Sequence, residues 1–418
     1  MFDLHLTPEQ LEIRRTVRDF VEREIKPIAL RRDRVEDFDE RFPWEVLDKA
    51  SRMGLRTLAL SQDLGGGGAD CLTSCIVTEE LAVGDVGVAA TLAQTSTFGH
   101  IWFDRVMTPE QRARFLPDYL ADDRYHLAFA GHEPDTDLGW CYYRPLMPGT
   151  GYKTTAARDR NGDWVINGIK NFITNAPVAK LIAVQVRTDP KKSGPAGVST
   201  LLIPRDTPGL TIREHDKVGR RLGSNGELAF EDCRVPAANL LGQEGKSPLI
   251  GEGAGSVGRG IPRFQAMNLG IGRAAYEAAL EYARLRVQGG RPVVEHQAVG
   301  LALAEMAISL EVARSMVWRA AWAADHPDAY ADGSLPDLPL QTIAKVFTSE
   351  TVQRVVLQAA QVFGGMGVMR ELPMQKYVRD ALIFLHSEYT NDVARLRIAE
   401  AVAGYQRAEV AAAAGERI

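Results

Sequence analysis

A change of residue periodicity, from helical to β-rich and back, restricts the fold of this chain more than any other feature. Over 1–125, apolar residues recur at helical spacing, and two Thr-Pro-Glu-Gln runs, at 7–10 and 108–111, form capping boxes that open helices. We therefore predict an all-helical first domain over 1–125. It contains further helices at Trp44–Met53 and Leu72–Val83 and a loop at Gly65–Gly68.

Residues 126–245 form a second domain in which short β-rich runs alternate with turn residues. This spacing predicts a compact antiparallel sheet and not alternating β-α units. The predicted strands are Tyr125–Ala130, Tyr152–Arg158, Trp164–Ile169, Leu181–Val186, Leu201–Pro204 and Glu227–Phe230. The helical period returns over 246–418, with helices at Phe264–Arg286, His296–Ala324, Thr342–Phe363 and from Val393 onward. The predicted fold class is α+β, and the third domain is a four-helix bundle.

The composition is that of an ordinary globular protein and argues against several function classes. With 418 residues, 45% hydrophobic and 25% charged, the chain can bury a sizeable core. A net charge of -5 without a basic stripe argues against a nucleic-acid partner. No apolar run reaches the ~18 residues of a membrane helix, and no leader is recognised, so we expect no membrane insertion. Four cysteines without a CxxC pair predict buried thiols, no metal site and a cytoplasmic protein.

Two glycine-rich segments need separate interpretations. Gly253–Gly258 spells the GxGxxG fingerprint of dinucleotide-binding folds, but only Pro248–Ile250 precedes it where a buried strand is required. We interpret it as a flexible loop. Gln361–Gly367, which reads QVFGGMG, closes a predicted helix. Its glycines either stop the helix or let a dinucleotide approach the backbone, and the residues alone leave both interpretations open.

The segment from Gln361 to Ala399 carries a specific resemblance. It reads QVFGGMGVMRELPMQKYVRDALIFLHSEYTNDVARLRIA. It resembles the C-terminal signature of the acyl-CoA dehydrogenase family, which combines a Q-x-x-GG-x-G stretch, a P-x-x-K/R-x-x-RD stretch and an E-G-T tripeptide. The positions in register are Gln361, Gly364, Gly365, Gly367, Pro373, Lys376, Arg379, Asp380, Glu388, Thr390 and Arg395.

Resemblance to this family extends over nearly the whole chain. Leu269–Arg286 is similar to a long helix that ends in a flavin-contacting arginine, and Pro292–Gln297 to its P-x-x-x-x-Q continuation. Phe230–Pro236 resembles the F-x-D-x-x-VP motif, and Asn167–Ala176 resembles the NG-x-K-x-W-I-T-N-A strand beside the flavin. The family architecture, helical then β then helical, is the order predicted above.

The resemblance implies FAD-dependent α,β-dehydrogenation of an acyl-CoA thioester. In this family a carboxylate removes the α-proton, the β-hydrogen leaves as a hydride to flavin N5, and electrons pass to an electron-transfer flavoprotein. By position Glu388 is the base, and its own N–H with a flavin ribityl hydroxyl would hold the thioester oxygen. Without the family match, Glu388 would be interpreted as a solvated acid.

The resemblance also implies which residues contact FAD. Phe172 would lie beside the ring, and the Thr174 hydroxyl would point toward N5. Arg286, Gln288 and Gln361–Gly365 would reach the FAD of a neighbouring subunit, so a homotetramer, a dimer of dimers, is expected. The predicted FAD contacts are Phe129, Gly131, His132, Phe172, Ile173, Thr174, Arg286, Gln288, Gln297, Gln361, Gly364, Gly365 and Thr390.

The chain departs from the family pattern in the loop that helps hold the acyl-CoA. The family's T-E-P-G-A-G-S-D becomes H-E-P-D-T-D-L-G over 132–139, so only the glutamate and the proline match. Asp135 and Asp137 add bulk and negative charge where small glycines are usual. His132 either bonds the flavin or is a packed, neutral histidine.

Two further departures concern the substrate. An arginine that the family uses near CoA is replaced by Ile261, and Arg259 or Arg263 could substitute for it. The glycine of E-G-T is Tyr389, whose side chain would enter the acyl pocket. An unusual acyl group or carrier is therefore expected, and the predicted substrate contacts are Arg263, Tyr389 and Leu138.

Two other functions stay open. Flavin-dependent oxidases and two-component monooxygenases share the fold and act on substrates without CoA. The lost glycines and Ile261 favour them, whereas Glu388 weighs against them. The third possibility is a non-catalytic flavin-binding subunit of a hetero-oligomer.

Overall fold

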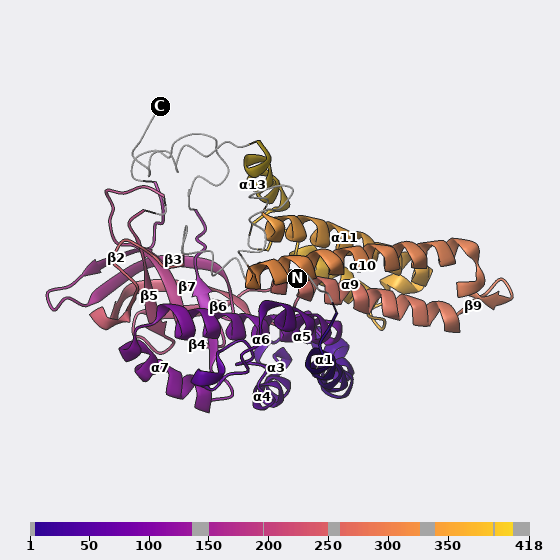
Figure 1. Ribbon diagram of the computed structural model, residues 1–418, viewed down its shortest axis with the longest axis horizontal. Coiled ribbons are helices and arrows are strands. Elements are labelled where there is room, and N and C mark those ends of the chain that lie inside the picture. Colours follow the sequence, from indigo (N-terminus) through magenta and orange to yellow (C-terminus); the bar gives the residue numbers. More distant parts are fainter. Residues whose placement is uncertain are drawn as a thin grey trace.

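A computed structural model describes residues 5–135, 150–194, 196–249, 260–326, 339–387 and 389–403 (Figure 1). The chain forms helices, then a sheet, then helices, which confirms the predicted α+β fold class. The Gly253–Gly258 segment and Cys141 lie outside the described residues, whereas Cys71, Cys75 and Cys233 are buried, as predicted. No helix within the described ranges is long and apolar enough to cross a membrane.

The first helical layer begins at the predicted capping box. The Thr7 hydroxyl accepts a hydrogen bond from the Gln10 N–H at 3.1 Å, and Thr108 repeats the arrangement with Gln111. The helices are α1 Pro8–Phe20, α2 Lys26–Asp33, α3 Phe38–Arg41, α4 Trp44–Arg52, α5 Cys71–Gly84, α6 Val86–Gly99 and α7 Pro109–Ala121. π-helical turns at Val21–Ile25 and His100–Val106 extend α1 and α6. Every residue of α5 is buried, including Glu79 and Glu80.

The sheet has eight strands in the order β6-β7-β3-β2-β4-β5-β8, with β1 beside β4. They are β1 His126–Ala130, β2 Thr155–Arg158, β3 Trp164–Thr174, β4 Ala179–Arg187, β5 Val198–Pro204, β6 Leu210–Glu214, β7 Asn225–Val235 and β8 Leu240–Leu241. The predicted antiparallel sheet is confirmed for most strand pairs, but β1 and β2 each pair with β4 in parallel. The long stretch of chain between these strands permits the parallel crossover.

The C-terminal helices form an elongated bundle (Figure 1). They are α9 Gly260–Leu285, α10 Gln297–Asp325, α11 Leu340–Phe363, α12 Met374–Ile383 and α13 Asn391–Ala403, with the hairpin β9 Val287–Gln288 and β10 Arg291–Pro292 after α9. Buried residues of both helical segments share one apolar cluster, for example Ile25 and Leu81 with Leu269 and Val352. The two helical segments therefore stabilise each other.

Candidate functional site

A bulge near the end of β3 presents one large aromatic ring to solvent. Lys170 pairs with Leu228 and Ile173 with Gly226, so two residues of β3 oppose one residue of β7. The bulged residue Phe172 has a left-handed φ of 56° and is 68% exposed. Bulges re-aim side chains and are frequent beside active sites. An exposed ring on a strained backbone is the geometry expected of a ligand-contacting residue.

Asn171 joins this bulge to the end of β1. Its N–H donates to the His132 carbonyl at 2.9 Å. Its Oδ1 accepts from the Phe172 N–H at 2.8 Å and from His215 Nε2 at 2.6 Å, which requires the tautomer of His215 with a proton on Nε2. The rings of Phe172 and His215 lie 5.1 Å apart. The structure thus brings together six predicted residues, called here the strand-end cluster: Phe129, Gly131, His132, Phe172, Ile173 and Thr174.

The members of the strand-end cluster differ in burial. Ile173 is buried in the sheet core, whereas Phe129 is half-buried and packs on Phe98. A Cβ at Gly131 would lie 3.0 Å from both Gln185 Oε1 and the Phe129 ring, so a larger residue would require one of these side chains to shift. The His132 side chain is exposed, and partial desolvation, with the charge of Lys170, lowers its pKa. Its imidazole is therefore neutral at neutral pH.

Glu133, one of the two loop residues that match the family, has a structural role. Its carboxylate accepts from Lys170 Nζ at 2.7 Å and from the backbone N–H groups of Lys153 and Thr154 at 2.6 and 3.0 Å. Burial lowers the pKa of Lys170 to about 8, and Glu133 opposes the shift. Asp135 of the same loop is exposed and forms an ion pair with Lys153. The loop is thus anchored by Glu133, and Asp135 faces solvent.

A second group of predicted residues gathers at the far end of the bundle. The rings of Tyr282 on α9 and Phe363 on α11 stack with centroids 4.2 Å apart, which brings the ends of these helices together. His296 Nε2 lies 3.0 Å from the Gln288 carbonyl and ties the hairpin to the start of α10. We call these exposed residues the bundle-end cluster: Arg286, Gln288, Gln297, Gln361, Gly364 and Gly365.

The two clusters lie far apart within one chain. Gln94 of α6 donates a hydrogen bond to the Thr174 carbonyl. Thr97 lies about one turn further along α6, and its hydroxyl accepts a hydrogen bond from Arg263 near the start of α9. From Arg263 to the end of α9 the helix rises roughly 33 Å. Figure 1 accordingly shows the β9–β10 hairpin at the end of the bundle that points away from the sheet. One bound ligand does not reach both clusters of the same chain.

The glycines after α11 differ in their surroundings. A Cβ on Gly364 or Gly365 would meet no atom within 4 Å, whereas a Cβ on Gly367 would lie 2.5 Å from the Ala360 carbonyl oxygen. Gly364 has a left-handed φ of 57° and ends the helix. Gly364 and Gly367 are thus required for the end of the helix. Gly365 has room for a side chain and no left-handed φ, so the local backbone does not explain its glycine.

Replacing these glycines separates the two interpretations of QVFGGMG. We expect Gly365→Ala to leave the free energy of unfolding of the apoprotein almost unchanged but to weaken FAD binding, because its methyl group fills open space beside the chain. Gly367→Ala should instead cost about 1–3 kcal/mol of stability through overpacking. Urea unfolding and flavin titration measure the two effects. Equal FAD affinity in Gly365→Ala and wild type would leave only the helix-stop interpretation.

The other predicted residues are scattered. Arg263 is buried and donates from Nη1 to Thr97 Oγ1 at 2.8 Å. The half-buried Tyr389 ring lies 4.2 Å from the Arg397 guanidinium, and the Thr390 hydroxyl accepts from the Val393 N–H at the start of α13. The predicted base and substrate residues Glu388 and Leu138 lie outside the described residues, as do Arg259 and Asp137.

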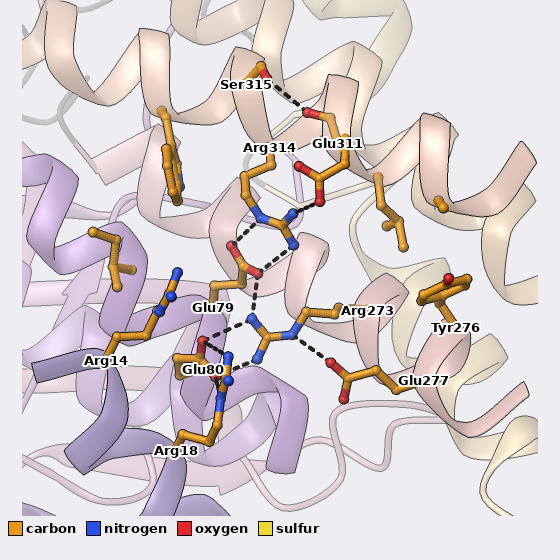
Figure 2. Close-up of a pocket in the computed structure, with 14 residues that line it drawn as sticks. Arg14, Arg18, Glu79, Glu80, Arg273, Tyr276, Glu277, Glu311, Arg314 and Ser315 are labelled. Carbon is orange, nitrogen blue, oxygen red and sulfur yellow. Dashed lines mark hydrogen bonds and ion pairs between the residues drawn. The ribbon is translucent and has the colours of Figure 1, made fainter. Parts of the chain in front are cut away.

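A cavity of about 540 Å³ lies between α1, α5, α9 and α10. Figure 2 shows the residues that line it. Arg273 bridges Glu79 and Glu80 at 2.7 and 2.5 Å, Arg314 reaches Glu79 at 3.0 Å, and Arg18 reaches Glu80 at 2.9 Å. These cations are neutralised by glutamates, so the network joins four helices. None of the predicted site residues lines this cavity.

Comparison with known proteins identifies the family. Models of the acyl-CoA dehydrogenase N-terminal, middle and C-terminal domains match residues 7–123, 149–233 and 262–403. An acyl-CoA dehydrogenase of Bacillus subtilis (strain 168) is 34% identical over 404 residues, which cover 96% of this chain and 100% of that protein. The chain belongs to the acyl-CoA dehydrogenase family.

Solved structures share the whole fold. Butyryl-CoA dehydrogenase from Megasphaera elsdenii has a TM-score of 0.84 and 30% identity, with 96% of this chain and 100% of that chain covered. PigA with FAD and proline has a TM-score of 0.81 and 27% identity, with 96% and 98% covered. Members of this family are flavoenzymes that oxidise CH–CH donors, which confirms the predicted enzyme class.

Two residues of the candidate site, Asn225 and Arg220, were not predicted from the sequence. Asn225 Nδ2 donates to the Thr174 hydroxyl at 3.3 Å, and Arg220 Nη2 donates to the same oxygen at 3.0 Å. Asn225 lies opposite Thr174 because β3 pairs with β7. Neither residue has a sequence signal for this contact: strand pairing brings Asn225 to Thr174, and the connection between β6 and β7 brings Arg220 there.

Proposed function

We propose that this chain is an FAD-dependent acyl-CoA dehydrogenase in which Glu388 removes the α-proton of an acyl thioester. The observation that carries the proposal is the bulge in β3, which exposes the Phe172 ring at the strand end that also bears Thr174. This pair matches the residues that the family places beside its flavin. Bound FAD supplies the acceptor for the β-hydride, so the chain must orient substrate and exclude water.

The described residues fit a flavin dinucleotide. Phe172 offers an exposed aromatic face, the Thr174 hydroxyl offers a hydrogen bond, and Gly365 leaves its backbone open. Glu388 would take the proton, and its own N–H would hold the thioester oxygen where negative charge develops. Arg263, Tyr389 and Leu138 are proposed to contact the substrate.

We propose a homotetramer, arranged as a dimer of dimers, because a complete cofactor site needs both clusters. The two clusters of one chain lie at opposite ends of α9, so the bundle-end cluster would serve the FAD of a neighbouring subunit. Leu301, Ile308 and Val312 form an exposed apolar stripe on one face of α10, as expected of a helix covered by a second copy. Light scattering that gives a monomer with full FAD content would contradict the shared site.

The proposal also covers the acyl group, the electron acceptor, the cellular compartment and the domain boundaries. The lost glycines of the 132–139 loop and the charge of Asp135 support an unusual acyl group or carrier. An electron-transfer flavoprotein is the proposed acceptor, and buried cysteines suit a reducing compartment such as the cytoplasm. Domain boundaries near 125 and 245 are consistent with α7 ending at Ala121 and α9 beginning at Gly260.

An anaerobic absorbance screen tests the function. The purified yellow protein is mixed with straight, branched, cyclic and aromatic acyl-CoAs, and loss of the flavin band is followed. We expect at least one acyl-CoA to bleach the flavin and electron-transfer flavoprotein to restore its colour. Bleaching by none, with oxygen consumed when the flavin is reduced, would favour the oxidase or monooxygenase alternative. A colourless protein that takes up no FAD would contradict both.

A further inference from the structure

The guanidinium of Arg220 is buried behind the end of β3. Arg220 is 5% exposed and has a left-handed φ of 53°, a conformation that costs a non-glycine residue on the order of 1–3 kcal/mol. Its N–H donates to Asp380 Oδ1 at 2.6 Å, which fixes the backbone. Its side chain then reaches the strand-end cluster, where Nη2 donates to Thr174 Oγ1 at 3.0 Å.

The hydrogen bonds at Thr174 determine the direction of its hydroxyl proton. A threonine hydroxyl has two acceptor sites and one proton to donate. Arg220 Nη2 and Asn225 Nδ2 lie 3.0 and 3.3 Å from Oγ1, and neither group can accept a proton. Both acceptor sites are therefore filled, and the proton is left for a third group. Among the described residues no acceptor for it is found.

Arg220 is poorly explained as a stabilising residue of the apoprotein. Burial lowers its pKa to about 10, so it still carries a proton at neutral pH. Its Nε has no hydrogen-bond partner among the described residues. Glu214, Asp380 and Asp85 act on its guanidinium through charge alone, and their carboxylates form ion pairs with Lys217 or Lys376. A buried cation without a directly bonded carboxylate costs free energy.

We propose that Arg220 is a positioning residue that commits the Thr174 hydroxyl to donate a hydrogen bond to the oxidised flavin ring. The inference rests on the proposed function, since it needs FAD at the strand-end cluster. A ring nitrogen or carbonyl of oxidised flavin is the acceptor that the Thr174 proton lacks. Without Arg220 the hydroxyl is free to rotate, and the donor is no longer held toward the ring.

FAD titration of the apoprotein tests the inference by a double-mutant cycle. We expect Arg220→Met and Thr174→Val each to weaken binding of oxidised FAD by about fivefold to tenfold, the worth of one hydrogen bond. Because Arg220 acts on FAD only through the Thr174 hydroxyl, the double variant should bind FAD no more than about twofold more weakly than Thr174→Val. Arg220→Lys, which keeps a charged donor, should bind FAD more tightly than Arg220→Met. If the double variant loses FAD affinity by the product of the two single losses, the inference is overturned.

The stability of the apoprotein distinguishes a positioning role of Arg220 from a structural one. A methionine of similar volume removes a buried charge, so apo Arg220→Met should be at least as stable as the wild type in urea. The matched control is Arg221→Met, which loses bonds to the Asp33 and Val35 carbonyls and should lower stability without changing FAD affinity. Normal FAD affinity in Arg220→Met, with weak binding in Thr174→Val, overturns the inference alone. Normal affinity in Thr174→Val overturns the placement of FAD itself.

Discussion

Replacing Glu388 with glutamine is expected to slow bleaching of the flavin by acyl-CoA on the order of 10²–10⁴-fold, the usual contribution of a general base. The amide has nearly the same size as the carboxyl group but takes no proton from the substrate α-carbon. FAD binding should be unaffected, because the flavin contacts proposed here lie on other residues. Anaerobic stopped-flow absorbance, with the acyl-CoA that bleaches the wild type fastest, measures the rate.

Asp392 provides the matched control for Glu388. It lies four residues further along the chain, its side chain is 94% exposed, and it forms only a 3.7 Å ion pair with Arg395. Asp392→Asn makes the same carboxylate-to-amide change and should leave the bleaching rate within a factor of about two, as expected of a solvated surface pair. If Glu388→Gln reduces its flavin as fast as Asp392→Asn does, another residue is the base.

The second large effect is on stability, at Lys376. This lysine is 4% exposed and its Nζ lies 2.8 Å from Asp85 Oδ2 and 2.5 Å from Asp380 Oδ2. Asp85 caps α6 through the Gly87 N–H, and Asp380 holds the Arg220 N–H, so one cation joins both helical segments and the sheet. Lys376→Met leaves two buried carboxylates without their cation and should cost about 3–5 kcal/mol or more. Urea unfolding measures the loss.

The loss in Lys376→Met should depend on pH in a defined direction. Burial already raises the pKa of Asp380, and the charge of Lys376 opposes that shift. Without the lysine, the folded variant should bind protons more tightly than its unfolded chain, so its stability should rise as pH falls from 7 toward 5. The control is Lys26→Met, which breaks an exposed pair with Glu22 and should cost at most about 1 kcal/mol at any of these pH values. A loss of stability in Lys376→Met that is small, or that does not change with pH, would contradict the buried triad of Lys376, Asp85 and Asp380.

Local chemistry made much of the fold predictable. The capping boxes at Thr7 and Thr108 form as expected, because a threonine three residues before a glutamine satisfies the free N–H groups of a helix start. The prediction for β3 was less complete, since the strand continues to Thr174 through a bulge. The pairing with β7 creates that bulge, and no local pattern encodes it. Helix α12, absent from the prediction, is a short helix whose Lys376 and Asp380 are buried.

For the candidate site, the sequence by itself determined the family and the fold class and proposed residues such as Phe172, Thr174 and Gly365, because these lie in contiguous motifs with fixed spacing. Only the tertiary structure decided what surrounds them. It separated Gly365 from the helix stop, gave Glu133 a structural role, placed the two clusters at opposite ends of α9, and brought Arg220 to Thr174 across 46 positions of sequence. The physical reason is that hydrogen bonds and burial depend on distance in space, and strand pairing and helix packing set that distance without leaving a local pattern in the chain.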